Sequence, residues 1–353
     1  MEQEQKFIVS SSPHIRDVES IPKIMWTVVL FLAPAAVAGC YFFGWDRFNR
    51  TFSFRPVLVV LGAILVAVAT EAAMLHLRKQ PLRRALDGSA VITGLLFAMV
   101  VSPAVPWYVV VFGSFIAIAV GKQLFGGLGH NIWNPALVGR AFVTLAWAEP
   151  MTRWWVEPLN PAYATVQAAS AATPLSAVSL SKEVSFSIKN LFWGYVPGCL
   201  GETSAIMLLL GGIFLIIFKY ADWRVPLTYI ASTVLLCMAI PYKNAPQWFK
   251  SLPWYEEMAF YAFSGGLFLG AFFMATDMVT SPITPKGRFI FALGCGILTA
   301  LIRKLGGYPE GVCYSILIMN TCVPLIDRFT KPARFGLSTL KAQRQKQSQA
   351  KAA

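Results

Sequence analysis

The chain has 353 residues, of which 56% are hydrophobic and only 13% are charged. Soluble domains carry roughly 25% charged residues, so this composition excludes an ordinary soluble protein and favours an integral membrane protein. The formal net charge of +13 is explained by Lys and Arg in the cytoplasmic loops of such a protein, and we expect no nucleic acid among its partners.

Apolar blocks recur along the chain, several of them close to the ~20 residues that a helix needs to cross a bilayer. Residues 1–23 are polar, lack the pattern of a signal peptide and are expected to lie in the cytoplasm. Two groups of five spans occupy residues 24–148 and 204–329, and residues 330–353 form a polar tail that we expect to be disordered. The ten predicted spans are 24–43, 54–75, 85–101, 105–124, 133–147, 204–218, 225–240, 258–275, 289–301 and 311–326. The shorter ones can also be read as re-entrant segments.

Lysine and arginine residues indicate the orientation of these spans. If the N-terminus is cytoplasmic and every span crosses, the cytoplasmic side holds nearly twice as many of these residues as the outer side. This count places Lys122 on the cytoplasmic side and Arg303 on the outer side. The asymmetry predicts that both termini are cytoplasmic and that the long connection 149–203 is extracytoplasmic.

The two groups of spans share short sequence features in the same order. Ser102-Pro103 ends the third span and Ser281-Pro282 follows the eighth, while a Gly-Gly pair precedes both the fifth and the tenth. Because each half holds an odd number of spans, the second half must be inverted relative to the first. We therefore expect an all-α integral membrane protein of about ten transmembrane helices in two inverted five-helix repeats. Coincidence among apolar segments is the alternative.

Polar breaks occur in both halves, at residues 129–135 and 275–288. Non-helical backbone at membrane depth is tolerated only where protein or water satisfies its polar groups, so these breaks are candidate linings of a ligand site or an ion path. Ordinary interfacial loops are the other interpretation. Intramembrane acids are rare and often functional, which makes Glu71 and Asp277 the candidates for an ion path.

Cysteine and histidine spacing gives no sign of a metal centre within the chain. The six cysteines form no C-x-x-C pair, and the three histidines are far apart in sequence. A zinc site needs several such ligands close together, so we expect none. An iron–sulfur site shared with another protein of a complex stays open.

The connection 149–203 contains the hexapeptide Ser170-Ala171-Ala172-Thr173-Pro174-Leu175. From the residues alone, a hydroxyl before a proline indicates only a turn. The hexapeptide resembles, however, the flavinylation motif of the membrane flavoproteins in the Rnf and sodium-pumping NADH:quinone oxidoreductase complexes. The resemblance implies that the Thr173 hydroxyl is esterified by the phosphate of FMN, with Ser170 and Ala172 as motif neighbours, and that a dedicated flavin transferase installs the cofactor.

Further segments are similar to the same family over nearly the whole chain. Residues 197–204 resemble its Gly-rich segment, and residues 274–282 and 134–141 match two others. Within the first segment, Gly198 and Gly201 would permit close backbone approach to the cofactor, with Glu202 as a further candidate binding residue. Aromatic residues of the connection could stack on the flavin ring, or they could simply lie at the membrane interface.

The resemblance implies a membrane subunit of an ion-pumping redox complex in the bacterial cytoplasmic (inner) membrane, with no catalytic residues that act alone. Such a complex passes electrons between ferredoxin and NAD and couples this to Na⁺ or H⁺ translocation. The implied partners are a second covalent flavoprotein, iron–sulfur subunits and membrane lipid, and a non-covalent riboflavin is a further implied cofactor. Chain length favours the D subunit of the Rnf complex over the B subunit of the quinone-reducing pump. A solute transporter or channel without a redox role is the remaining alternative.

Overall fold

The computed structural model describes residues 19–159, 172–181, 186–242, 245–306 and 311–331. Most of these residues are helical, which confirms the all-α class. The exceptions include a two-stranded antiparallel hairpin, β1 (Trp45–Asp46) and β2 (Thr51–Phe52), in which Trp45 pairs with Phe52. Most of the polar N-terminal segment, nearly all of the C-terminal tail, and Ser170 lie outside the described residues.

Each predicted span overlaps one or more helices of the structure, and further short helices lie in the connecting segments. The first half contains α1 (Ile21–Gly44), α2 (Arg55–Leu77), the 3₁₀ turn η1 (Leu82–Leu86), α3 (Ser89–Met99), α4 (Trp107–Ile118), the π-helical turn η2 (Ala119–Gln123) and α5 (Pro135–Ala146). The connection holds α6 (Ala148–Thr152), α7 (Pro174–Ser179), α8 (Ile188–Trp193) and the 3₁₀ turn η3 (Leu200–Glu202). The second half contains α9 (Ala205–Ile217), α10 (Arg224–Ala239), α11 (Gln247–Lys250), α12 (Trp254–Phe263), α13 (Leu267–Leu269), the π-helical turn η4 (Gly270–Met274), α14 (Pro285–Leu305) and α15 (Val312–Phe329).

Within the described part of the chain, three helices are long and apolar enough to cross a membrane, namely α1, α2 and α15. A fourth candidate is the pair formed by α12 and the segment Leu267–Met274, which is bent by 62°. Five other apolar segments have 10–17 residues. These features are consistent with a membrane protein whose helices differ widely in length.

Local sequence signals explain where several of the helices begin. Asn134 caps α5, because its side chain accepts a hydrogen bond from the Ala136 backbone N–H, and Pro135 supplies the first helical residue. Thr284 caps α14 in the same way through the Gly287 N–H, and there too a proline follows the cap. A capping side chain satisfies a backbone donor that the helix leaves free, and proline at the first position already has the helical φ angle. The polar breaks therefore end in defined helix starts.

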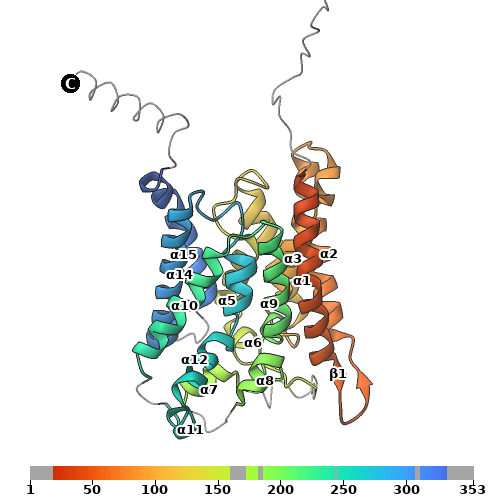
Figure 1. Cartoon of the computed structure of the whole chain (residues 1–353). Helices are drawn as coiled ribbons and strands as arrows, with labels where there is room; N and C mark the ends of the chain where they lie inside the picture. The colour runs from red at the N-terminus through yellow and green to blue at the C-terminus, as the bar shows by residue number, and fades with distance from the viewer. Residues whose placement is uncertain (1–18, 160–171, 182–185, 243–244, 307–310, 332–353) are drawn as a thin grey trace, which may run out of the picture.

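The first helices of the two halves, α1 and α9, pack against each other in opposite directions. Phe31 in α1 stacks on Phe214 near the end of α9, with ring centroids 5.4 Å apart. Gly39, further along α1, lies against the residues before α9, where an added Cβ would come 2.6 Å from the Leu200 carbonyl oxygen. Residues further along α1 therefore contact residues earlier in the segment that leads into α9. The two helices are antiparallel (Figure 1).

The elements of the connection gather at one end of the helical bundle. Figure 1 shows α7, α8 and α11 at the same end as β1. The start of α1 and the end of α15 lie at the opposite end. The described chain therefore begins and ends on one side, and Thr173, directly before α7, lies on the other side.

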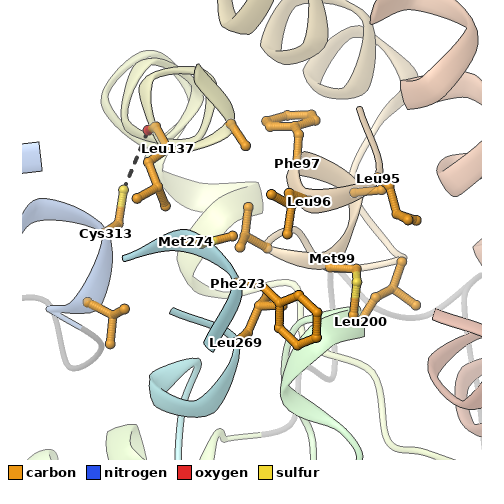
Figure 2. Close-up of a cluster of buried hydrophobic side chains, with 14 of the residues drawn as sticks. Leu95, Leu96, Phe97, Met99, Leu137, Leu200, Leu269, Phe273, Met274 and Cys313 are labelled. Atoms are coloured by element: carbon orange, nitrogen blue, oxygen red, sulfur yellow. Dashed lines mark hydrogen bonds between the residues drawn. The ribbon is translucent and has the colours of Figure 1, made fainter. Parts of the chain in front are cut away.

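The core lies where broken and short helices meet. Figure 2 shows Phe97 of α3, Leu137 of α5 and Met274 of η4 converging on one cluster, which Cys313 of α15 joins. The Cys313 thiol donates to the Leu137 carbonyl oxygen at 3.5 Å. These side chains are nearly or fully buried. Their packing holds the short helices in place relative to one another.

The eighth predicted span, 258–275, is not continuous. It breaks after α12 at Ser264 and Gly265, and Gly265 has a φ of +69°, which suits only glycine well. The Arg303 guanidinium donates to the carbonyl oxygens of Tyr261 and Ser264, at 3.1 Å each. Arg303 is therefore a buried residue of α14 that satisfies the carbonyls freed by the break. The charge count placed it on the outer side, between the predicted spans 289–301 and 311–326, whereas the structure includes it in α14.

Candidate functional site

Thr173 lies directly before α7, and its side chain is 4% exposed. Its hydroxyl oxygen accepts a hydrogen bond from the Ser176 backbone N–H at 3.3 Å and lies 3.0 Å from the Ser176 hydroxyl. Pro174, the first residue of α7, fixes the backbone angle that starts the helix. The Thr-Pro pair therefore holds one hydroxyl in a defined position on a helix cap.

The Thr173 side chain lines a cavity of about 60 Å³. Arg140 and Thr144 of α5 form another part of its wall, and Tyr314 of α15 a third. Among the described residues that line the cavity, Arg140 is the only one with a charged side chain. The structure thus brings a threonine of the connection beside an arginine of the first half.

This set of donors suits a phosphate group. Guanidinium N–H groups and hydroxyls are the side chains that bind phosphate oxygens most directly. Arg140 is 9% exposed, and water therefore screens its charge only weakly. The residues present fit a phosphoester on the Thr173 oxygen.

The other predicted cofactor residues lie at different distances from this cavity. Ala172 precedes Thr173 and is half-buried. Gly198 and Gly201 do not line the cavity. A Cβ on Gly201 would lie 2.7 Å from Leu269 Cδ2 and 2.9 Å from the Met99 carbonyl oxygen, so this glycine permits close packing of η3 between α3 and α13.

Glu202 does not line the cavity but is linked to Arg140 through Cys199. The Arg140 guanidinium donates to Cys199 Sγ at 3.9 Å, and the Cys199 backbone N–H donates to Glu202 Oε2 at 3.4 Å. Glu202 Oε1 is buried and has no hydrogen-bond partner among the described residues. The positive charges that act on the carboxylate are those of Arg140 and Arg303. The Gly-rich segment thus meets the Thr173 cavity through Arg140.

Among the described aromatic residues of the connection, Trp155 reaches the cavity. Trp155 is 6% exposed, lines the cavity, and donates from Nε1 to the Thr152 carbonyl oxygen at 2.8 Å. Trp193 and Tyr195 are exposed. Trp155 is therefore the best placed of these aromatic residues to contact a group held at Thr173.

Asp277 lines a second cavity, of about 100 Å³, nearer the opposite end of α5. Its carboxylate accepts hydrogen bonds from the Thr280 hydroxyl at 3.1 Å and the Val279 backbone N–H at 3.3 Å. Lys122 of η2 and Asn131 also line this cavity. Asp277 therefore faces polar groups of the first half across a small internal space.

Glu71 does not line the second cavity but reaches it through a partner. Both of its carboxylate oxygens lie 2.7 Å from Lys122 Nζ, and this nitrogen also donates to the Ser89 hydroxyl at 2.6 Å. Gln123 donates to Glu71 Oε1 at 3.2 Å. The Lys122 side chain is 2% exposed, so this residue, which the charge count placed on the cytoplasmic side, is buried inside the protein. Its ammonium group is buried because Glu71, two spans earlier in the prediction, neutralises it.

The two polar breaks face each other beside the second cavity. Each follows a π-helical turn, η2 in the first half and η4 in the second. The Asn134 side chain donates to the Met274 carbonyl oxygen at 3.3 Å, and so joins one break to the other. Single π-helical turns within helices occur frequently at functional sites. The structure thus assembles polar groups from both halves at one place inside the helical bundle.

Sequence reasoning passed over Lys122, Arg140 and Arg303 as site residues. Each is a cation inside or beside an apolar segment, which is the signal that the same reasoning used for Glu71 and Asp277. Lys122 even falls within the predicted span 105–124. Applying the rule to cations as well as acids would have found all three.

A sequence profile of the NQR2, RnfD, RnfE family matches residues 8–336. The chain is 46% identical to the D subunit of the proton-translocating ferredoxin:NAD(+) oxidoreductase complex of Clostridium ljungdahlii, over 94% of this chain and 96% of that protein. It is 40% identical to the D subunit of the Na(+)-translocating ferredoxin:NAD(+) oxidoreductase complex of Acetobacterium woodii, over 96% and 98% of the two chains. The chain belongs to the NQR2, RnfD, RnfE family.

Proposed function

We propose that this chain is the D subunit of an Rnf-type complex, an oxidoreductase that passes electrons between ferredoxin and NAD and couples this to ion translocation. The similarity over nearly the full length of relatives that carry this name supports the assignment. One of these relatives is named proton-translocating and another Na(+)-translocating, so the family includes both coupling ions. The chain works within a complex and is not an enzyme alone.

The cofactor in this proposal is FMN, joined through its phosphate to the Thr173 hydroxyl oxygen by a flavin transferase. A flavin supplies one- and two-electron redox chemistry when bound. The observation that carries the proposal is that the buried Thr173 hydroxyl shares a cavity with the Arg140 guanidinium. On the chain's side, α7 holds the ester oxygen in place, and Trp155 offers an aromatic surface beside it.

The proposed membrane arrangement is ten crossings in two inverted halves, with both termini cytoplasmic and Thr173 extracytoplasmic. The antiparallel packing of α1 and α9 supports the inversion. Each half also repeats one set of neighbours, since α4 packs between α2 and α5 and α14 packs between α10 and α15. The start of α1 and the end of α15 lie at one end of the bundle, opposite α7, as this topology requires.

Within this arrangement, we assign the second cavity to ion or electron passage between the two sides. Glu71, Lys122 and Asp277 would supply its fixed charges. A riboflavin held without a covalent bond is a further cofactor in this proposal, and its residues stay unassigned. Iron–sulfur subunits, a second covalent flavoprotein and lipid are the proposed partners.

Flavin fluorescence after denaturing gel electrophoresis tests the proposal. The protein from cells that contain the transferase should give a fluorescent band, and Thr173→Ala should give a dark band of equal protein amount. Ser179→Ala is the matched control, because it removes an exposed hydroxyl of the same helix that does not line the cavity. A dark wild-type band would favour a transporter without a redox role, and fluorescence in Thr173→Ala would place the anchor elsewhere.

A further inference from the structure

The Arg140 side chain occupies a position that hydrophobicity alone does not explain. Arg140 lies in the middle of α5, a helix of 12 residues, and is 9% exposed. A buried cation is costly unless an anion or several acceptors accompany it. The guanidinium donates to Cys199 Sγ at 3.9 Å, interacts electrostatically with the buried Glu202 carboxylate, and lines the cavity that Thr173 also lines.

Hydroxyl groups from separate elements surround that cavity. Thr173 and Ser176 belong to the α7 cap, Thr144 lies one turn after Arg140 in α5, and Tyr314 comes from α15; all four residues line the cavity. No carboxylate is among the described residues that line the cavity. The Thr144 and Ser176 hydroxyls already donate to the Arg140 and Thr173 carbonyl oxygens, so the guanidinium is the charged donor that this cavity offers to an anion.

We propose that Arg140 is the residue that receives the phosphate of the flavin ester on Thr173. This inference rests on the proposed function and deepens it by naming the group that holds the cofactor's charge. A phosphodiester carries one negative charge, and one guanidinium neutralises it. The planar guanidinium can donate two parallel hydrogen bonds to two phosphate oxygens, which also fixes the direction of the ester.

The existing contacts of Thr173 are compatible with this arrangement. Its oxygen accepts from the Ser176 N–H at 3.3 Å, and an ester oxygen can still accept that bond. The Ser176 hydroxyl already donates to the Thr173 carbonyl oxygen at 2.9 Å, so it keeps a partner when the Thr173 hydroxyl proton is replaced. Arg140 thus acts as a positioning residue for the phosphate, outside the redox chemistry.

Two measurements on the full-length protein test the role of Arg140. The first is the fraction of protein that carries covalent flavin, by in-gel fluorescence, soon after expression in cells with the transferase. We expect about a tenfold decrease in Arg140→Gln and a smaller one in Arg140→Lys, which keeps the charge but loses the planar fork. The second is the phosphorus-NMR resonance of the ester, which should shift in both variants.

Arg55→Gln is the matched control. Arg55 is a partly buried arginine at the start of α2 that donates to the Pro103 and Ala104 carbonyl oxygens and does not line the cavity. The Arg55→Gln variant changes the net charge by the same amount as Arg140→Gln. It should leave both the labelled fraction and the phosphorus resonance as in the wild type. If Arg140→Gln fails to accumulate, Arg140→Lys decides the question through the resonance.

The two proposals fail in distinguishable ways. A dark wild-type band, or fluorescence that persists in Thr173→Ala, overturns the flavin site itself. A labelled wild type with a dark Thr173→Ala, together with normal labelling and an unchanged phosphorus resonance in the Arg140 variants, overturns only the role of Arg140. A shift of the same size in Arg55→Gln would also overturn it, because the effect would then not be specific to the cavity.

Discussion

Lys122 Nζ lies 2.7 Å from both carboxylate oxygens of Glu71, in a buried ion pair that joins the π-helical turn η2 to α2. The side chains are 2% and 4% exposed. Ser89 and Gln123 supply further hydrogen bonds. A buried pair of this kind is stable only while both partners and their additional hydrogen bonds are present.

Removing one member of this pair should therefore destabilise the protein strongly. We expect Glu71→Gln to lower the free energy of unfolding by about 3–5 kcal/mol, because it leaves the Lys122 ammonium buried without its counter-charge. Thermal unfolding of the detergent-solubilised protein measures the effect. The double variant Glu71→Gln with Lys122→Met should recover most of the loss, and a double variant as unstable as the sum of the single ones would contradict the pairing.

The same double variant separates stability from transport. If the pair belongs to an ion path, the double variant should fold and transfer electrons between ferredoxin and NAD, but move fewer ions per electron. Ion uptake into vesicles, measured alongside NAD reduction, gives this ratio. An unchanged ratio would show that the pair only stabilises the helices.

A separate prediction concerns Asp277, which lines the second cavity. Its carboxylate accepts hydrogen bonds from the Thr280 hydroxyl and the Val279 backbone N–H. Asp277→Asn keeps the size of the side chain and removes its charge, so we expect ion translocation per electron to fall at least severalfold while the protein still assembles. Thr280→Val is the control, because it removes one hydrogen bond and leaves the charge. A similar loss in both variants would point to local packing rather than to the charge.

The apolar pattern predicted the helices well, because a bilayer forces spanning segments to be apolar and helical. The break at Ser264 and Gly265 escaped this pattern, since Gly266 to Ala275 is as apolar as the helix before the break. The break depends on Arg303, which is distant in sequence and satisfies the freed carbonyls. A local pattern cannot report a partner supplied by another helix.

One part of the candidate site was proposed from the sequence and another was not. Thr173 was selected through a motif, and a motif is local. Its neighbour Arg140 comes from α5, and only the packing of the connection against α5 brings the two residues to one cavity. Likewise, both acids were selected as rare intramembrane charges, while the pairing of Glu71 with Lys122 depends on how α2 packs against α4 and η2. The sequence identified individual side chains of unusual chemistry. The contacts between these side chains could be seen only in the folded structure.

A contact of the loop between α9 and α10 should make the stability of the protein depend on pH. Asp222 Oδ2 lies 2.9 Å from Arg288 Nη1 of α14, and its carboxylate accepts from the Arg224 backbone N–H at 3.0 Å. Burial opposes ionisation, but the hydrogen bonds from Arg224 and Arg288 outweigh it and hold the pKa of the Asp222 carboxyl below its usual value of 3.8. An aspartate with a lowered pKa stabilises the folded state above the pKa of the unfolded chain and loses this effect as the pH falls through the folded pKa.

Asp222→Asn should accordingly lower the melting temperature at pH 7, and the difference from the wild type should shrink as the pH is lowered below 3.8. The effect should stay within about 1 kcal/mol, because the pair is partly exposed to solvent. Thermal unfolding across a pH series measures it, and Arg288→Gln should reproduce the difference at pH 7. A difference that persists undiminished at the lowest pH would exclude the carboxylate as its cause.

The break in the eighth span gives a sharp test of backbone geometry. Gly265 has a φ of +69°, and an added Cβ would lie 2.8 Å from Leu175 Cδ1 and 3.2 Å from Arg303 Nη2. Gly265→Ala should therefore destabilise the protein by about 1–2 kcal/mol from the left-handed backbone alone, and by more from the crowding of α7. Because Leu175 belongs to the helix that Thr173 caps, covalent flavin should decrease as well.

Gly62→Ala is the control within α2, where the new Cβ would meet only Trp107 at an ordinary 3.5 Å. We expect it to leave labelling unchanged and stability equal or slightly higher, and an equal loss in both variants would show that the position of the break is not what matters.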